Sequence, residues 1–334
     1  MMESIRDAFG KALVEAGREH SNVVAVSCDL KGATRLQPFF DAFPERSFEV
    51  GIAEANGIGI SAGLALSGFR PFISSFAAFI AGRNVEIRTS IAYNRAPVVV
   101  VGTHGGLIGP DGTTQAGLQD IAVMRSIPGF TVLQPATPIE TRAIVDHVAK
   151  ARDMVYLRIA RNTVPELFDE RYRFEPGRGI IVRDGGQVTI ISSGPPLHAA
   201  LACAEALAGS IDVMVVNMPS LKPIDEEMIL HCARRTRAIV TVEDHSILGG
   251  LGSGVAEVVA GAGVGVPVVR HGIADVFIES AKPAELERAY KLDAEGVALV
   301  VRRTWAWLMA DAKSKGSPDR QKYSPLYLDR RAAR

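Results

Sequence analysis

Short apolar runs and longer stretches of helical periodicity alternate along the chain. The runs are rich in Val and Ile, as in VVAVS (23–27) and the nearly all-Val APVVVVG (96–102). Such runs are typical of strands in a parallel sheet that is covered on both faces, and the stretches between them repeat apolar residues as helices do. The first half predicts strands at 23–27, 72–75, 96–102, 130–135 and 155–160, and helices at 4–17, 55–67, 76–92 and 138–150, with 55–67 buried on all sides.

A polar, proline-containing segment at 162–179 interrupts this alternation. A second, smaller set follows, with strands at 187–193, 211–217, 238–244 and 266–270 and helices at 197–207, from about 225, 253–261, 283–290 and 295–310. Alternation of strand and helix over this length predicts doubly wound, mostly parallel sheets. We therefore expect an α/β fold with two domains at residues 1–165 and 181–311, a linker at 166–180 and a basic tail at 312–334.

Charge and composition narrow the class of protein. The 334 residues include 37 basic and 37 acidic side chains, so no net field points to nucleic acid or to an anionic membrane. The longest uncharged stretch contains Gly194-Pro195-Pro196 and cannot form one membrane-spanning helix. The three cysteines lie far apart without metal-ligand spacing, which favours buried, reduced thiols. We expect a cytoplasmic protein that binds neither nucleic acid nor membrane.

A single carboxylate stands in a markedly apolar part of the sequence. Glu54 precedes the glycine-rich stretch GIGISAG (57–63), and no Lys or Arg occurs between Arg46 and Arg70. An acid at a helix start is stabilised by the helix dipole by about 0.3–1 kcal/mol, which is a purely structural interpretation. The apolar surroundings favour a second one, in which the carboxylate carries or shares a proton. The residues by themselves leave both interpretations open.

Several motif-based functions lack support. In GIGISAG the glycines do not follow directly on a strand, because Glu54 occupies the turn, and no acid ends the next strand, so a dinucleotide-binding motif is not favoured. Close helix packing explains these glycines better. The sequence contains no Walker A motif, His-x-x-x-His or Cys-x-x-Cys, so P-loop and metal-site functions are not indicated.

Candidate binding residues come just after predicted strands. His104 directly follows the all-Val strand and opens a long polar loop, Thr103–Asp120, of a kind that often carries function. Arg161 follows another strand at the edge where such sheets bind ligands, and arginine suits phosphate. Phe76 and Phe79 are core residues by default, but a ring pair near a buried carboxylate also suits a flat heterocycle.

Longer segments resemble a known family. FEVGIAEANGIGISAGLALSGFRPF, SSFAAF, VVVVGTHGGLIGPDG and QDIAVMRSIPGFTVLQPATP are similar to the pyrimidine-binding domain of transketolase, and LKPIDEEMI and IVTVEDHSILGGLGSGVAEVV to its C-terminal domain. The family's diphosphate-binding domain, marked by Gly-Asp-Gly followed by Asn, has no counterpart in this sequence. The chain therefore resembles the second subunit of a split transketolase. The resemblance implies an α2β2 heterotetramer whose partner subunit holds the diphosphate of thiamine diphosphate and Mg²⁺ or Ca²⁺, with no metal site here.

The resemblance also implies an activity, the transfer of a two-carbon ketol unit between sugar phosphates, which needs the partner. By position, Glu54 matches the glutamate that hydrogen-bonds N1′ of the aminopyrimidine and favours the tautomer that takes the thiazolium C2 proton. Phe79 matches the ring that packs on the pyrimidine, and Phe76 matches an accessory ring. Asp29 matches a family aspartate at the family's interval from Arg6 and is assigned to cofactor binding.

Substrate residues follow from the same matches. Arg6 and Arg161 match two arginines that clasp a sugar phosphate, His104 a histidine on a substrate hydroxyl, and Asp111 an aspartate that reads hydroxyl stereochemistry. Gln115 stands where the family has a donor-binding histidine, and it can form hydrogen bonds but cannot hold a proton. A third pyrimidine-pocket ring, often Tyr in the family, falls at Gly82. These departures suggest an unusual sugar substrate.

Three alternatives remain open. The β subunit of a 2-oxoacid dehydrogenase shares both domains and the glutamate, but Arg6, Arg161 and His104 favour a sugar phosphate over a 2-oxoacid. Deoxyxylulose-phosphate synthase usually has Arg where His104 stands and is one continuous chain. A third alternative, from another class, is a non-catalytic scaffold or regulatory homologue. His245, in VEDHS, has no role that the sequence indicates.

Overall fold

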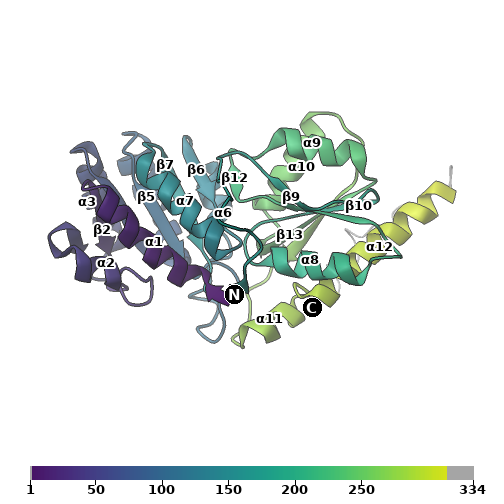
Figure 1. Cartoon of the computed structure of the whole chain (residues 1–334), viewed down its shortest axis with the longest axis horizontal. Helices are drawn as coiled ribbons and strands as arrows, with labels where there is room; N and C mark the ends of the chain where they lie inside the picture. Colours follow the sequence, from purple (N-terminus) through teal and green to yellow (C-terminus); the bar gives the residue numbers. More distant parts are fainter. Residues whose placement is uncertain (1, 314–334) are drawn as a thin grey trace.

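Two β-sheets organise residues 2–313, the part of the chain that this computed structural model describes (Figure 1). The first has seven strands in the order β12-β6-β7-β5-β4-β2-β3, and the second has five in the order β14-β13-β10-β11-β9. Within each sheet one edge strand, β12 or β9, pairs antiparallel, and the other pairs are parallel. The predicted α/β fold with two doubly wound, mostly parallel sheets is therefore confirmed.

The strands are short and, near the sheet centres, fully buried. Those of the first sheet are β2 (Val23–Ser27), β3 (Ser47–Glu49), β4 (Arg70–Phe76), β5 (Val99–Thr103), β6 (Phe130–Leu133), β7 (Met154–Ile159) and β12 (Ser220–Lys222). Those of the second are β9 (Ile180–Arg183), β10 (Val188–Ser192), β11 (Val213–Asn217), β13 (Ile239–Ser246) and β14 (Val268–Ile273). A separate antiparallel pair joins β1 (Met2–Ser4) to β8 (Thr163–Pro165).

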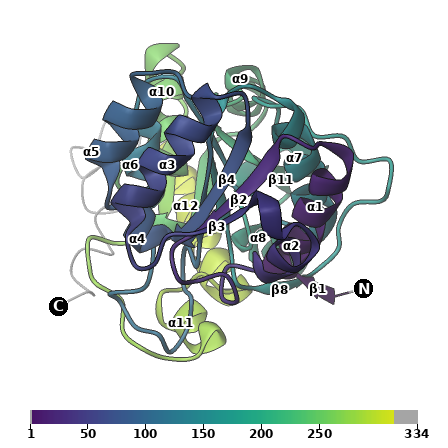
Figure 2. The same ribbon diagram turned by 90° about the vertical axis from the view of Figure 1, so that its left-hand side faces the viewer.

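Helices cover both faces of each sheet (Figures 1 and 2). Side-chain caps at Ser4, Thr137 and Asp225 fix three of their starting points, because each accepts a hydrogen bond from a first-turn backbone N–H. On the first sheet, α1 (Ile5–Glu19), α2 (Gln37–Ala42) and α7 (Pro138–Lys150) lie opposite α3 (Glu54–Leu66), α4 (Ala77–Ala81), α5 (Asn84–Glu86), a π-helical turn (Ile87–Ala92) and α6 (Asp120–Ser126). On the second, α8 (Pro196–Ala206) and α12 (Ala294–Lys313) lie opposite α9 (Glu226–Arg235) and α10 (Leu251–Gly261), with α11 (Pro283–Ala289) near one end.

Two helix predictions were wrong in detail. The helix expected at 76–92 breaks after Ala81, where Gly82 disfavours helix and Arg83 leaves helical backbone angles, and resumes as α5 and the π-helical turn. The helix expected to be buried on all sides, α3, exposes one face that includes Ala55, Gly59 and Leu66. Only Gly57 of its glycines packs closely, against Ile73 and Cys28, whereas Gly59 and Gly63 face open space. The apolar character of α3 therefore exceeds what this chain buries.

Two of the three hydrophobic clusters among the described residues contain side chains from both halves of the chain. Residues of the first sheet such as Val26 and Val132 belong to the same buried cluster as Met214 and Leu251 of the second half. The strand β12, which the sequence pattern did not reveal, comes from the second half but completes the first sheet through its pairing with β6. Strand β9, helix α6 and strand β8, which lies in the polar segment at 162–179, were also missed, because each is too short for a clear periodicity.

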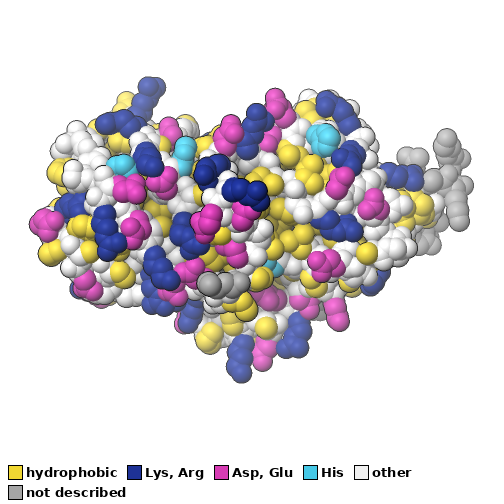
Figure 3. Space-filling view, in the orientation of Figure 1, with side chains coloured by type: hydrophobic (Ala, Val, Ile, Leu, Met, Phe, Trp, Pro, Cys, Tyr) yellow, Lys and Arg dark blue, Asp and Glu magenta, His cyan; other side chains and the backbone are white. Residues whose placement is uncertain are grey.

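Four further features of the structure bear on the remaining sequence predictions. Basic and acidic side chains are interspersed over the face in Figure 3, in keeping with their equal numbers. The three cysteines are free and buried. Within residues 2–313, none of the helices is long and apolar enough to cross a membrane. Helix α12 runs on to Lys313, and the rest of the expected basic tail lies outside the described residues.

Candidate functional site

The carboxyl ends of three neighbouring parallel strands bring most of the expected site residues to one edge of the first sheet. Phe76 ends β4, His104 follows β5, and Asp29 follows β2. Neighbouring strands β2, β4 and β5 run parallel, so these positions share an edge, which is where such sheets bind ligands. Glu54 joins them from the first turn of α3.

Glu54 is both a helix-start acid and a buried carboxylate. It is the first residue of α3, which has no side-chain cap at its N-terminus, and only 7% of Glu54 is exposed. Ser75 Oγ, on β4, donates a hydrogen bond of 2.8 Å to Glu54 Oε1. Among the described residues no donor reaches Oε2, so this oxygen is available to a ligand. Ser75 was not singled out by the sequence, because a strand serine has no distinguishing pattern.

Three rings lie at the carboxyl ends of β4 and β5, beside Ser75. Phe76 and Phe79 stack with 5.5 Å between centroids and 18° between planes. The His104 ring lies against Phe76, with 3.9 Å between the two ring centroids. Both phenylalanines are only partly buried, so they are not ordinary core residues. Gly82, where the family often has a third ring, is exposed and contributes no side chain.

His104 is held in one tautomer by its neighbours. Arg6 Nη1 lies 3.2 Å from His104 Nε2, and an arginine can only donate, so Nε2 accepts. Nδ1 then carries the proton and donates to Thr103 Oγ1 at 3.0 Å, and that hydroxyl donates onward to the Ser75 backbone carbonyl at 3.3 Å. Burial, reinforced by the positive charges of Arg6, Arg161 and Arg35, lowers the pKa of His104 to about 3. The imidazole is therefore neutral at neutral pH.

Three arginines converge on His104, one more than the sequence indicated. Burial and the charges of Arg35 and Arg161 lower the pKa of Arg6, whose Nε is buried without a hydrogen-bond partner. Arg35 is the addition; it has φ +64° and forms an ion pair with Asp7. It lies in the loop between β2 and α2, and no pattern in that loop singles it out from the sequence. Together the three guanidinium groups form a positive site suited to an anion.

The other expected residues lie less centrally. Asp111 forms an ion pair with Arg161 at 2.6 Å, with each side chain about two-fifths exposed. Gln115 is partly exposed, and its Nε2 donates to Thr114 Oγ1 at 3.3 Å. Asp29 is exposed, has φ +58°, and its backbone N–H is bound by Glu49. The structure therefore joins Glu54, His104 and Arg6 in one network and leaves Asp29 and Gln115 outside it.

Comparison with known proteins assigns the chain to a family. Residues 2–166 match the family model for the transketolase pyrimidine-binding domain, and residues 177–297 match the model for the transketolase C-terminal domain. The chain belongs to the transketolase family. This agrees with the resemblance inferred from the sequence motifs, including the stretch around Glu54.

Relatives of this transketolase-family chain include proteins of similar length. It is 40% identical over 301 residues to the putative transketolase C-terminal section of Methanocaldococcus jannaschii, covering 89% of this chain and 94% of that protein. It is 37% identical to the 6-deoxy-6-sulfo-D-fructose transketolase subunit of Clostridium sp. (strain MSTE9), covering 88% and 92%. A solved structure described as "Split gene transketolase, inactive beta4 tetramer" superposes with a TM-score of 0.84 at 44% identity, covering 91% and 98%.

Proposed function

We propose that this chain is the catalytic, pyrimidine-binding subunit of a split thiamine diphosphate-dependent transketolase. In this proposal it moves a two-carbon ketol unit between sugar phosphates. The observation that carries the proposal is the continuous network from Glu54 through Ser75 and Thr103 to His104 and Arg6. It supports the proposal because the carboxylate assigned to the cofactor and the positive site assigned to the substrate lie at one edge of one sheet.

The residues present fit the pyrimidine half of the cofactor. Glu54 Oε2 is free to hydrogen-bond a ring nitrogen, and the stacked Phe76–Phe79 pair offers a partly exposed aromatic wall. When bound, thiamine diphosphate supplies the carbon nucleophile of the family's reaction. We assign its diphosphate and the accompanying Mg²⁺ or Ca²⁺ to the partner subunit, since the sequence contains no Gly-Asp-Gly motif. Asp29 stays a proposed cofactor contact at the rim.

The remaining side chains have roles on the substrate. Neutral His104 holds its proton on Nδ1 and presents Nε2 as an acceptor, so a substrate hydroxyl that displaces Arg6 donates to it. The displaced guanidinium of Arg6, with Arg161 and Arg35, binds the anionic end of the sugar. Asp111 forms an ion pair with Arg161 at 2.6 Å. It contacts substrate hydroxyls only after the substrate anion replaces it on Arg161.

A partner subunit accounts for the uncovered surface beside Glu54. Ile52 is 85% exposed, Leu66 61% and Val85 54%, and the intervening face of α3 carries Gly59 and Gly63. An apolar, small-residue face next to half a binding site suits a protein surface. We propose that the diphosphate-binding subunit covers it in an α2β2 heterotetramer and that this chain is inactive alone, as the structural relative's "inactive beta4" description suggests for that protein.

The substrate is proposed to be an unusual anionic sugar. Gln115 replaces a family histidine, and one relative is named for a sulfonated ketose, which carries an anion of different chemistry from phosphate. The domain limits at 1–165 and 181–311 and a cytoplasmic location, which suits three free buried thiols, belong to the same proposal. The substrate part fails if xylulose 5-phosphate with ribose 5-phosphate is the best donor–acceptor pair.

Glu54→Gln tests the catalytic proposal. In the complex reconstituted with the diphosphate-binding subunit, we expect turnover to fall by about a hundredfold or more, because a carboxamide cannot hold the proton-sharing role of the carboxylate. Circular dichroism and complex formation serve as controls for folding and assembly. Unchanged turnover would support the scaffold alternative. Turnover of pyruvate in place of a ketose phosphate would support the 2-oxoacid dehydrogenase or deoxyxylulose-phosphate synthase alternatives.

A further inference from the structure

The loop between β5 and α6 carries His104, Asp111 and Gln115, and a buried arginine holds its base. Arg158, on β7, has a completely buried side chain. Its Nη2 donates to the Gly117 carbonyl at 2.9 Å and to the Asp244 carbonyl at 3.1 Å. Its Nε and Nη1 bind the carboxylates of Asp120 at 2.9 Å and Asp244 at 2.6 Å. One guanidinium group thus connects the end of the loop to the second half of the chain.

The second half also contacts the loop directly. The backbone N–H of Ser246 donates to the Leu118 carbonyl at 2.9 Å. At the other end of the loop, Gly106 has φ +87°, and a Cβ atom there would lie only 2.0 Å from Asp244 Oδ2. The two ends are tied together by the Gly106 N–H, which donates to the Gly117 carbonyl at 2.9 Å. Asp244 and Ser246 therefore fix both ends of the loop from strand β13.

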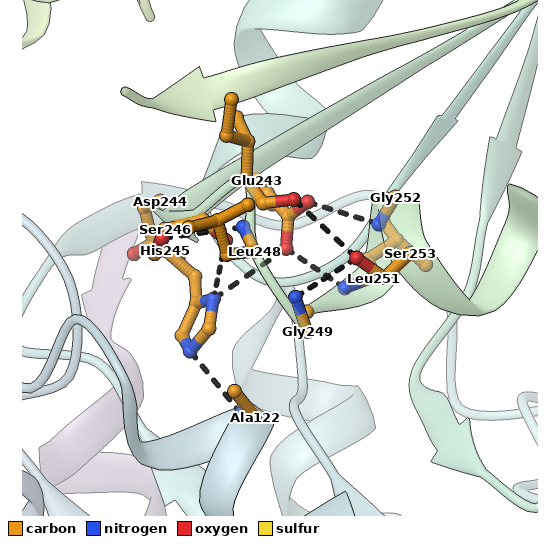
Figure 4. A network of polar contacts seen from close by, with 12 residues as sticks. Ala122, Glu243, Asp244, His245, Ser246, Leu248, Gly249, Leu251, Gly252 and Ser253 are labelled. Carbon is orange, nitrogen blue, oxygen red and sulfur yellow. Dashed lines mark hydrogen bonds and ion pairs between the residues drawn. The ribbon is translucent and has the colours of Figure 1, made fainter. Parts of the chain in front are cut away.

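Neighbouring residues of β13 have different partners (Figure 4). Glu243 accepts the backbone N–H groups of Leu251 and Gly252 at 2.8 and 2.9 Å, at the start of α10. His245 Nε2 accepts the backbone N–H of Ala122 in α6 at 3.4 Å. Glu243 is as deeply buried as Asp244 but lies on the α10 side and contributes no hydrogen bond to the loop. It provides a matched comparison for Asp244.

We propose that Asp244 and Arg158 are positioning residues for the substrate, through which the C-terminal half sets the conformation of the loop that carries His104 and Asp111. This inference deepens the proposed function and rests on it for its kinetic consequence. A fully buried ion-paired arginine is costly in desolvation and is often no better than an apolar replacement for stability, so a positioning role is a reason for its presence. The C-terminal half then affects substrate binding without touching the substrate.

The first test is hydrogen–deuterium exchange of the isolated chain. We expect Asp244→Asn to speed amide exchange in residues 105–118 by about tenfold, since Arg158 then loses one of its two carboxylates, while exchange in α3 stays unchanged. Arg158→Lys, which keeps the charge but not the fork, gives the same result. Glu243→Gln changes exchange at the start of α10 but not in 105–118. Equal loop exchange in wild type and both loop variants would overturn the proposal.

The second test measures kinetics in the reconstituted complex with a panel of sugar phosphates that includes xylulose 5-phosphate. Asp244→Asn is expected to raise KM for the sugar about tenfold, with the affinity for thiamine diphosphate unchanged, whereas Glu243→Gln leaves KM as in wild type. An unchanged KM in Asp244→Asn would contradict the positioning role. If the wild-type complex turns over no sugar phosphate, the proposed function fails, and the exchange experiment still decides whether Asp244 anchors the loop.

Discussion

Ser75 Oγ donates a 2.8 Å hydrogen bond to Glu54 Oε1, and the backbone carbonyl of the same serine accepts from Thr103 Oγ1 at 3.3 Å. One residue of β4 thus connects the carboxylate proposed for the cofactor with the histidine proposed for the substrate. Its hydroxyl leaves only the second oxygen of Glu54 open to a ligand. The orientation of the carboxylate is therefore set before a cofactor binds.

Ser75→Ala tests this orientation. We expect kcat in the reconstituted complex to fall about tenfold and the free energy of unfolding to fall by about 1 kcal/mol, because Glu54 loses its buried donor. Ser74→Ala is the matched control: Ser74 is equally buried, but its hydroxyl has no hydrogen-bond partner, so turnover should be unchanged. Equal effects of the two substitutions would show that Ser75 acts only through packing.

Arg35→Ala tests the third arginine of the positive site. Removing it should raise KM for an anionic sugar about tenfold with kcat nearly unchanged, because the anion is bound in both the ground state and the transition state. Asp7→Asn should act in the opposite direction, since it releases Arg35 from its ion pair. Steady-state kinetics with phosphorylated and unphosphorylated forms of one sugar separates the charge effect. A similar rise in KM for the unphosphorylated form would contradict the assignment.

The lowered pKa of His104 predicts a pH dependence of stability in the isolated chain. The pKa is about 3 in the folded state and 6.5 ordinarily, so the unfolded state binds the extra proton between these values. The free energy of unfolding therefore decreases as pH falls from 6.5 towards 3, by about 1.4 kcal/mol per pH unit for this group, and is unaffected by it above 6.5. Urea unfolding of His104→Asn across this window should show a shallower slope, and an identical slope would refute the prediction.

A substitution on the exposed face of α3 should block assembly with the partner subunit without lowering the stability of the isolated chain. Gly59→Leu should leave the free energy of unfolding of the isolated chain unchanged or raise it by up to about 1 kcal/mol, since a Cβ atom there meets nothing within 4 Å and glycine disfavours helix. It should nevertheless block association with the diphosphate-binding subunit, as measured by analytical ultracentrifugation.

Gly57→Leu is the matched comparison on the same helix. Its Cβ would lie 2.9 Å from Ile73 Cδ1 and 3.3 Å from Cys28 Sγ, so this change should destabilise the isolated chain by about 1–3 kcal/mol. Normal assembly of the Gly59→Leu chain would show that the partner binds elsewhere.

The sequence predicted the parts of the fold that have strong periodicity. The Val-rich strands β2 and β5, and the helix that Thr137 caps, lie where their patterns placed them within a residue or a few. The pattern failed at α3, because the composition of a surface proposed to bind another subunit is indistinguishable from that of a surface buried in the chain's own core. It also failed at β12 and β9, which are short edge strands whose positions depend on distant partners.

Some residues of the candidate site were predicted from the sequence, and others became apparent only in the structure. Glu54 and His104 were identified because each is a polar residue next to an apolar run, and the structure joins them through Ser75 and Thr103. Arg35 was missed because its convergence on His104 depends on a turn with positive φ, which the sequence pattern does not encode. The Asp111–Arg161 pair joins residues fifty positions apart in sequence and appears only in three dimensions.

Strand β12 limits where this chain can be divided into separately folding pieces. It crosses from the second half to complete the first sheet beside β6. A fragment that ends before residue 177, where the second family match begins, would leave the β6 edge unpaired and prone to self-association. The two halves are thus expected to unfold in a single cooperative transition. In the proposed split enzyme the diphosphate-binding domain lies on another chain, but a split between the two family domains of this chain would cut through a shared sheet.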